Sequence, residues 1–187
     1  MATISTPRAT LADLAQVRSK AELIDGRIVS LMPTGFLPSR IALRIARSLD
    51  DHAQRIGSGY AFADNVGYAV PELTSGRESF SPDASFFAGE APENAMSFIE
   101  GVPTFAVEVR SENDYGAAAE QAMASKRADY FEAGTLVVWD VDPIAQSVRS
   151  HSHSSPATPR VFRSGDVADA EPALPGWRLP LAGLFER

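Results

Sequence analysis

Near its start the chain shows a pattern of hydrophobic and polar positions that is typical of a short hairpin. The stretch Glu22–Val29 has two apolar runs on either side of Asp25-Gly26. Such a pair favours a tight turn, because both residues tolerate positive φ. The pattern predicts two strands joined at Asp25-Gly26. A short helix over Leu11–Lys20, with Thr10 as its N-cap, is expected to precede them.

Two longer segments repeat their apolar positions with the period of an α-helix. After a loop at 33–38, Ser39 opens the first predicted helix, which runs to about Ile56. The second spans roughly Tyr115–Ala133 and ends at Gly134. Most arginines of the first helix avoid its apolar stripe and form either a solvated face or one that contacts phosphates. These arginines are Arg40, Arg44, Arg47 and Arg55, and the neighbouring Asp50 and Asp51 weaken the phosphate interpretation.

Apolar runs between and after these helices predict a β-sheet. The order strand, helix, strand over 104–141 implies a right-handed crossover with a locally parallel pair, while other segments suggest hairpins. We therefore expect an α/β fold with a restriction-endonuclease-like mixed sheet flanked by helices, as one domain over 11–187 after a flexible tail at 1–10. The predicted strands are Tyr60–Val70, Phe80–Phe87, Thr104–Val109 and Leu136–Val141. Edge strands are expected at Gln146–His151 and Arg160–Phe162, on either side of a Ser/Pro-rich loop, and Leu174–Leu179 is expected to return to the sheet.

Composition narrows the class of protein. Of 187 residues, 44% are hydrophobic and 22% charged, which is typical of a globular domain. There is no apolar run of membrane-spanning length and no apolar signal-peptide core at the N-terminus, so we expect a cytoplasmic protein without a membrane partner. The absence of cysteine excludes disulfides and thiolate metal sites. The net charge of −7 counts against tight non-specific binding of nucleic acid, but acidic metal ligands would themselves add negative charge.

Three charged residues interrupt apolar patterns. Asp83 follows Pro82 at the mouth of an apolar strand, where it is either a turn residue or a ligand. Glu108 lies within Phe105–Val109, where an ionised carboxylate is costly unless it is paired or bound to a cation. At an edge strand Glu108 would instead face water, although Ala106 shares its face. Lys126 lies in an apolar helical stripe, so it either extends outward to solvent or serves a buried acidic site.

Together these residues suggest a metal-dependent hydrolytic site. Asp83 and Glu108 on neighbouring strands would offer the hard oxygen ligands that suit Mg²⁺ or Mn²⁺. Lys126, on the helix that follows the Glu108 strand, could orient a water or neutralise charge on a phosphate.

Short motifs along most of the chain resemble the Uma2 (DUF820) group of the PD-(D/E)XK nuclease superfamily, a group of restriction endonuclease-like proteins. Their order and spacing carry the resemblance more than any one motif does. They are Glu22–Val29, Pro82-Asp83, Val107–Ser111, Lys126 with Tyr130, Glu132–Gly134, Val138–Pro143 and Leu174–Trp177 with Leu184-Phe185.

The resemblance implies metal ligation by Asp83 and Glu108, with the Val109 carbonyl as a further ligand. In the wider superfamily the working lysine stands two residues after the glutamate, where this chain has Arg110. In Uma2-like chains it appears on the next helix, which points to Lys126. Glu22 resembles an additional acidic residue of the site, or is an exposed hairpin residue. The histidine often found at the start of the second helix is missing.

Three interpretations of the function remain open at this point. The first is a Mg²⁺-dependent (or Mn²⁺-dependent) endonuclease that hydrolyses DNA phosphodiester bonds, for which a homodimer would suit the cutting of both strands. The alternative is a non-catalytic nuclease-fold module that binds nucleic acid or protein, which the net negative charge favours. A plain structural domain with scattered buried charges is a third interpretation. Metal binding would separate the first two, since a non-catalytic module need not bind Mn²⁺.

Overall fold

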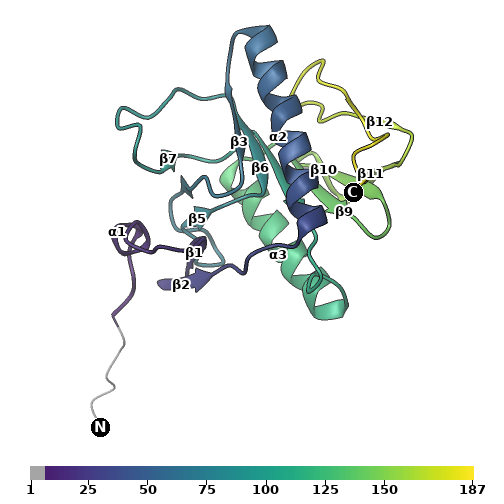
Figure 1. Ribbon diagram of the computed structural model, residues 1–187. Coiled ribbons are helices and arrows are strands. Elements are labelled where there is room, and N and C mark those ends of the chain that lie inside the picture. The colour runs from purple at the N-terminus through teal and green to yellow at the C-terminus, as the bar shows by residue number, and fades with distance from the viewer. Residues whose placement is uncertain (1–6) are drawn as a thin grey trace.

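The computed structural model describes residues 7–187, and its centre is a six-stranded mixed sheet between two helices (Figure 1). The strand order is β11-β10-β9-β8-β6-β3. Strands β8 and β9 run parallel, and the other neighbouring pairs of this sheet are antiparallel. The strands are β3 (Tyr60–Ala63), β6 (Ala84–Phe87), β8 (Phe105–Val109), β9 (Val137–Asp142), β10 (Ser147–Ser152) and β11 (Ser155–Arg163).

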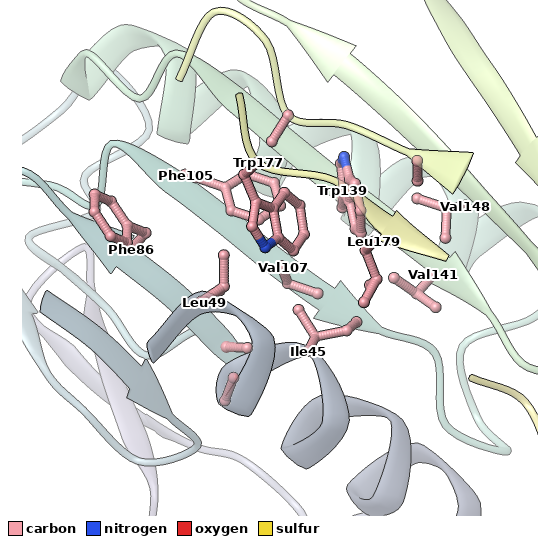
Figure 2. Close-up of a cluster of buried hydrophobic side chains, with 14 of the residues drawn as sticks. Ile45, Leu49, Phe86, Phe105, Val107, Trp139, Val141, Val148, Trp177 and Leu179 are labelled. Carbon is pink, nitrogen blue, oxygen red and sulfur yellow. The ribbon is translucent and has the colours of Figure 1, made fainter. Parts of the chain in front are cut away.

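Helix α2 (Phe36–Ile56) covers the face of the sheet that holds the larger apolar core (Figure 2). Phe105 and Val107 of β8 belong to this core, because side chains two residues apart on a strand share one face. Trp177, from the C-terminal segment, packs against Phe105 and Trp139 with ring centroids 5.7 and 5.2 Å apart. The α2 residues packed here include Ile41, Ile45 and Leu49, none of which is exposed.

Helix α3 (Ala117–Ala133) covers the opposite face, which holds the second core cluster. There Tyr130 packs against Ala106 and Val138 and stacks on Phe80 at 4.1 Å between centroids. Strand alternation places Glu108 on the same face as Ala106. The glutamate of this central strand is therefore directed at a helix, and the edge-strand interpretation is wrong.

Short elements surround the central sheet. Among them, the hairpin of β1 and β2 lies beside β5 (Ser79–Phe80), the short strand that precedes β6 in the chain. Its turn has φ of 50° at Asp25 and 63° at Gly26, as the Asp-Gly pair predicts. Leu23 N–H donates to Ser79 Oγ at 2.7 Å, which fixes the hairpin in place. The short elements are α1 (Leu11–Leu14), β1 (Ala21–Ile24), β2 (Arg27–Ser30), β4 (Tyr68–Ala69), β5 (Ser79–Phe80), β7 (Ile99–Glu100), β12 (Val167–Ala168) and β13 (Leu179–Pro180).

The end of α1, the start of α2 and two long strands differ from the sequence prediction. Helix α1 ends at Leu14, not Lys20, because Leu14 is the one buried residue of 11–20 and a longer helix would have no apolar face to bury. Helix α2 begins at Phe36, since Pro38 fits within a first turn whose N–H groups have no helical partner. The run 60–70 divides into β3 and β4, and the run 80–87 into β5 and β6, which belong to different sheets.

The C-terminal third also departs from expectation. Of the two predicted edge strands, β10 lies inside the sheet and β11 lies at its edge, while β3 forms the opposite edge. Much of the predicted Ser/Pro-rich loop belongs to the β10–β11 hairpin. The segment Leu174–Leu179 does not join the six-stranded sheet: Leu179 pairs with β12, while Leu174 and Trp177 pack on the core.

Of the predicted tail, residues 1–6 lie outside the described part of the chain. Residues 7–10 carry no helix or strand, but Ala9 N–H donates to Gly26 O at 2.8 Å and Arg8 pairs with Glu72. Within 7–187, the helices are too short or too polar to cross a membrane.

Candidate active site

Glu108 and Lys126 form the centre of a charged cluster between the sheet and α3. Lys126 Nζ lies 2.9 Å from Glu108 Oε1 and 3.0 Å from Oε2. Tyr130 donates a hydrogen bond of 2.7 Å to Glu108 Oε1. Residues four apart on a helix lie on one face, so a single turn of α3 brings both groups to the same carboxylate. Of the two alternatives for Lys126, the structure shows the contact with a buried acidic residue, because its ammonium is paired with Glu108.

Glu22 approaches the cluster from the hairpin. Its Oε1 lies 3.0 Å from Lys126 Nζ and accepts a hydrogen bond of 2.9 Å from Ser81 N–H, while its Oε2 pairs with Arg77. The residue is 2% exposed, so the alternative of an exposed hairpin residue is wrong. Arg77 also donates to Asp129 of α3, with Nε and Oδ2 2.8 Å apart. Glu22 therefore joins the hairpin, the loop before β5 and α3 through charged groups.

Asp83 stands one residue before β6, on the strand that neighbours β8. Its Oδ2 accepts a hydrogen bond of 2.8 Å from Val109 N–H, and its Oδ1 lies 2.9 Å from Lys20 Nζ. The side chain is 20% exposed. Asp83 therefore comes from the segment next to the Glu108 strand, and it is hydrogen-bonded to the backbone of Val109, the residue that follows Glu108.

Charge and burial set the protonation of the cluster. Burial raises the pKa of the Glu108 carboxyl, and the neighbouring Lys126 offsets only part of this effect. Burial acts in the same direction on Glu22, but Lys126 and Arg77 outweigh it and lower the pKa of that carboxyl. Burial opposes the charge of Lys126, yet Glu108 and Glu22 raise the pKa of the ammonium well above its usual range. Lys126 is therefore held in its charged form, which suits a fixed cation and does not suit a proton acceptor.

An open pocket of about 480 Å³ has these groups in its wall, including Asp83, Glu108, Val109 and Lys126. Its donors are carboxylate oxygens, which suit Mg²⁺ or Mn²⁺. Within residues 7–187 there is no group of three or more His, Cys, Asp or Glu side chains arranged to hold a metal ion. The donor set therefore fits a cation that takes one or two carboxylates and keeps several waters, and it does not fit a closed cage of protein ligands.

Four charged residues of this region were missed by the sequence analysis: Lys20, Asp64, Arg77 and Asp129. A signal existed for Lys20, because it precedes Glu22 by two residues and strand alternation puts both on one face. No local signal marks Arg77, whose partners Glu22 and Asp129 are 55 and 52 residues away.

The arginines of α2 lie in three different environments. Arg44 Nη1 donates to the carbonyl oxygens of Leu184 and Glu186 at 2.8 and 2.6 Å, and so ties the C-terminal segment to the helix. Arg55 contacts His52. Arg40 and Arg47 are exposed.

Comparison with known proteins identifies the family. A family model described as "Uma2: Putative restriction endonuclease" matches residues 9–182. The chain belongs to the Uma2 family. No curated protein matches it. It is similar to a solved structure from Anabaena variabilis ATCC 29413, described as "a putative nuclease belonging to DUF820", with a TM-score of 0.71, 20% identity, and coverage of 94% of this chain and 97% of that one. This likeness shows that the two chains share a fold.

Arg110 of this Uma2 chain is held in a network of its own. Its guanidinium donates to both carboxylate oxygens of Asp140, at 2.8 and 2.7 Å, and pairs with Glu120. These hydrogen bonds raise the pKa of Arg110 above its already high value. The Arg110 side chain is 2% exposed. Within residues 7–187, no ion pair joins it to Asp83 or Glu108, whereas Lys126 is paired with Glu108 directly. Lys126 is therefore better placed than Arg110 to serve the carboxylates.

Proposed function

We propose that this protein is a Mg²⁺-dependent or Mn²⁺-dependent endonuclease that hydrolyses DNA phosphodiester bonds. Asp83 and Glu108, with the Val109 carbonyl, would hold the cation, and Lys126 would serve as the fixed positive charge beside it. The observation that carries the proposal is the position of Lys126 Nζ, 2.9 Å from Glu108 and 3.0 Å from Glu22, in the wall of the pocket that Asp83 also lines. Membership of a nuclease family supports the same conclusion.

In hydrolysis a water oxygen forms a bond to phosphorus, the bond to one sugar oxygen breaks, and that oxygen leaves after gaining a proton. A bound cation would supply a lowered water pKa and charge neutralisation. Lys126 is held by two carboxylates, so its ammonium is preorganised to stabilise negative charge that develops on the phosphate. Tyr130 fixes Glu108 through its hydroxyl hydrogen bond and so acts as a positioning residue. Among residues 7–187, no histidine stands in the wall of this pocket to act as a base.

A non-catalytic module is the second candidate, and two observations favour it. Each carboxylate of the cluster already has a protein cation beside it, and the chain carries a net charge of −7. Such a module would use the same ion pairs only to join the hairpin to α3. It need not bind Mn²⁺.

The test is cleavage of duplex, single-stranded DNA and RNA with Mg²⁺, Mn²⁺ or EDTA. Cleavage should require the cation, and Asp83→Asn or Glu108→Gln should lower it by several orders of magnitude, on the scale of losing an essential group. Arg163→Gln, a change of an exposed residue on the edge strand β11 and outside the pocket wall, is the matched control and should cleave normally. Cleavage in EDTA, or full activity of Glu108→Gln, would place the activity elsewhere. No cleavage together with no calorimetric binding of Mn²⁺ would favour the module.

A further inference from the structure

Two aspartates face each other across the edge of the central sheet. Strands β3 and β6 are antiparallel with Ala63 opposite Ala84, so one step further places Asp64 beside Asp83. Like charges at opposed positions destabilise a strand pair unless a cation lies between them. Lys20 is that cation, because its ammonium pairs with both Asp64 and Asp83.

The lysine is held in this position by the hairpin. Lys20 directly precedes β1, and its carbonyl accepts a hydrogen bond of 2.9 Å from Leu31 N–H, which continues the hairpin by one residue pair. The side chain is 18% exposed and lies in the wall of the same pocket as Glu108. The hairpin therefore supplies a cation for Asp83 through Lys20, and an anion for Lys126 through Glu22.

The contacts of Asp83 make Lys20 a competitor of any bound cation. Its Oδ2 accepts a hydrogen bond of 2.8 Å from Val109 N–H, and Lys20 Nζ lies 2.9 Å from its Oδ1, so a metal that binds Oδ1 must share that oxygen with the ammonium. A divalent ion ligated by Oδ1 would stand within a few ångströms of the ammonium and repel it. Asp64, which is 49% exposed, offers a second acceptor for the lysine at the same place.

We propose that Lys20 is the built-in counterion of the metal-free site, and that a divalent cation displaces its ammonium from Asp83 onto Asp64. The inference rests on the proposed function, since it needs a cation at Asp83. It assigns Lys20 as a residue that sets metal affinity, and Asp64 as the group that receives the displaced charge.

Calorimetric titration of the metal-free protein with Mn²⁺ alone tests the exchange. Lys20→Met should bind Mn²⁺ about tenfold or more tightly than the unaltered chain, because one neighbouring charge within a few ångströms changes the affinity of a carboxylate for a proton by one to three powers of ten. Arg18→Met is the matched control. It removes an exposed cation from the same segment and should leave the affinity unchanged.

The role of Asp64 is tested by combining variants. Asp64→Asn should weaken Mn²⁺ binding when Lys20 is present, because the ammonium then has Asp83 as its remaining carboxylate partner. The same change should have little effect in the Lys20→Met background, since non-additivity reveals that one residue acts through the other. An equal effect in both backgrounds would mean that Asp64 merely attracts cations, and would overturn the exchange.

The remaining outcomes separate this inference from the proposed function. Mn²⁺ binding with equal or weaker affinity in Lys20→Met, in a variant whose circular dichroism and unfolding midpoint show that it folds, would make Lys20 a structural clamp and overturn the inference alone. Absence of Mn²⁺ binding in all variants would remove the metal site and the proposed function with it. Binding by Lys20→Met but not by the unaltered chain would support the exchange in its strongest form.

Discussion

At the scale of single residues, Lys126 matters because two carboxylates hold it in one orientation. A free lysine side chain samples many rotamers, whereas this ammonium lies about 3 Å from both Glu108 and Glu22. We expect Lys126→Met to lower the cleavage rate by roughly 10², the scale of losing one preorganised electrostatic partner, and to leave Mn²⁺ binding in place. Single-turnover cleavage and calorimetry on the same preparation would measure both effects.

The counterpart of that variant is Arg110→Met. The two changes remove equal charge, but Arg110 contacts Asp140 and Glu120 instead of the pocket carboxylates. Arg110→Met should therefore mainly lower the free energy of unfolding. If Arg110→Met slows cleavage more than Lys126→Met does, while both proteins remain folded, the roles of the two residues are reversed.

His52 gives the fold a pH dependence of its own. The side chain is 3% exposed, and burial, with a smaller contribution from Arg55, lowers the pKa of its imidazole. Below the ordinary value of about 6.5, the unfolded chain therefore binds a proton that the folded chain does not, and the free energy of unfolding falls as pH falls. His52→Leu should lose less stability between pH 7 and pH 5 than the unaltered chain, as measured by urea unfolding. Equal losses would show that His52 titrates alike in both states.

At the scale of elements, local patterns predicted the hairpin, both long helices and the central parallel pair. Each of these depends on neighbouring residues: a turn pair at Asp25-Gly26, a helical stripe ended by Gly134, an apolar run around Glu108. The division of 60–70 and 80–87 between two sheets could not be predicted locally, because it depends on which distant strand each half meets. The same limit explains why Arg77 was missed, whereas Glu108 and Lys126 interrupt patterns that their own elements display.

The placement of the hairpin can be tested at Gly76. Its φ is +81°, and an added Cβ would lie 3.0 Å from Asp25 Cα at the hairpin turn. Gly176 has a similar φ of +78° with no atom within 4 Å of an added Cβ. Gly176→Ala should lower the free energy of unfolding by about 1 kcal/mol, because alanine is disfavoured in a left-handed backbone. Gly76→Ala should lower it by about 1 kcal/mol or more beyond that, because the Asp25 backbone must also move.

Urea unfolding of the two variants would measure this difference. Gly76→Ala should also slow cleavage, since the hairpin carries Glu22, which holds Lys126, to the pocket, whereas Gly176→Ala should not. Similar unfolding energies for both variants would show that the hairpin tolerates the displacement.

At the scale of the whole molecule, the net charge of −7 opposes the approach of DNA. In the ion-pair network that borders the pocket, five carboxylates (Glu22, Asp64, Asp83, Glu108 and Asp129) pair with three cations (Lys20, Arg77 and Lys126), which leaves two negative charges within the network. One divalent cation would cancel that excess. For this chain the metal should therefore be needed to bind DNA and not only to cleave it.

Fluorescence anisotropy of a labelled DNA duplex, in Ca²⁺ or in EDTA at equal ionic strength, would test this requirement. Ca²⁺ serves as a probe cation of the same charge and the same preference for oxygen ligands. The unaltered chain should bind the duplex at least about tenfold more tightly in Ca²⁺, because attraction between protein and phosphates depends on the local balance of charge. Asp83→Asn loses a ligand of the cation, so its affinity should change much less between the two buffers. Equal affinity of the unaltered chain in both would mean that DNA is held by a surface remote from the pocket, and the exposed arginines of α2, Arg40 and Arg47, would then be the residues to change next.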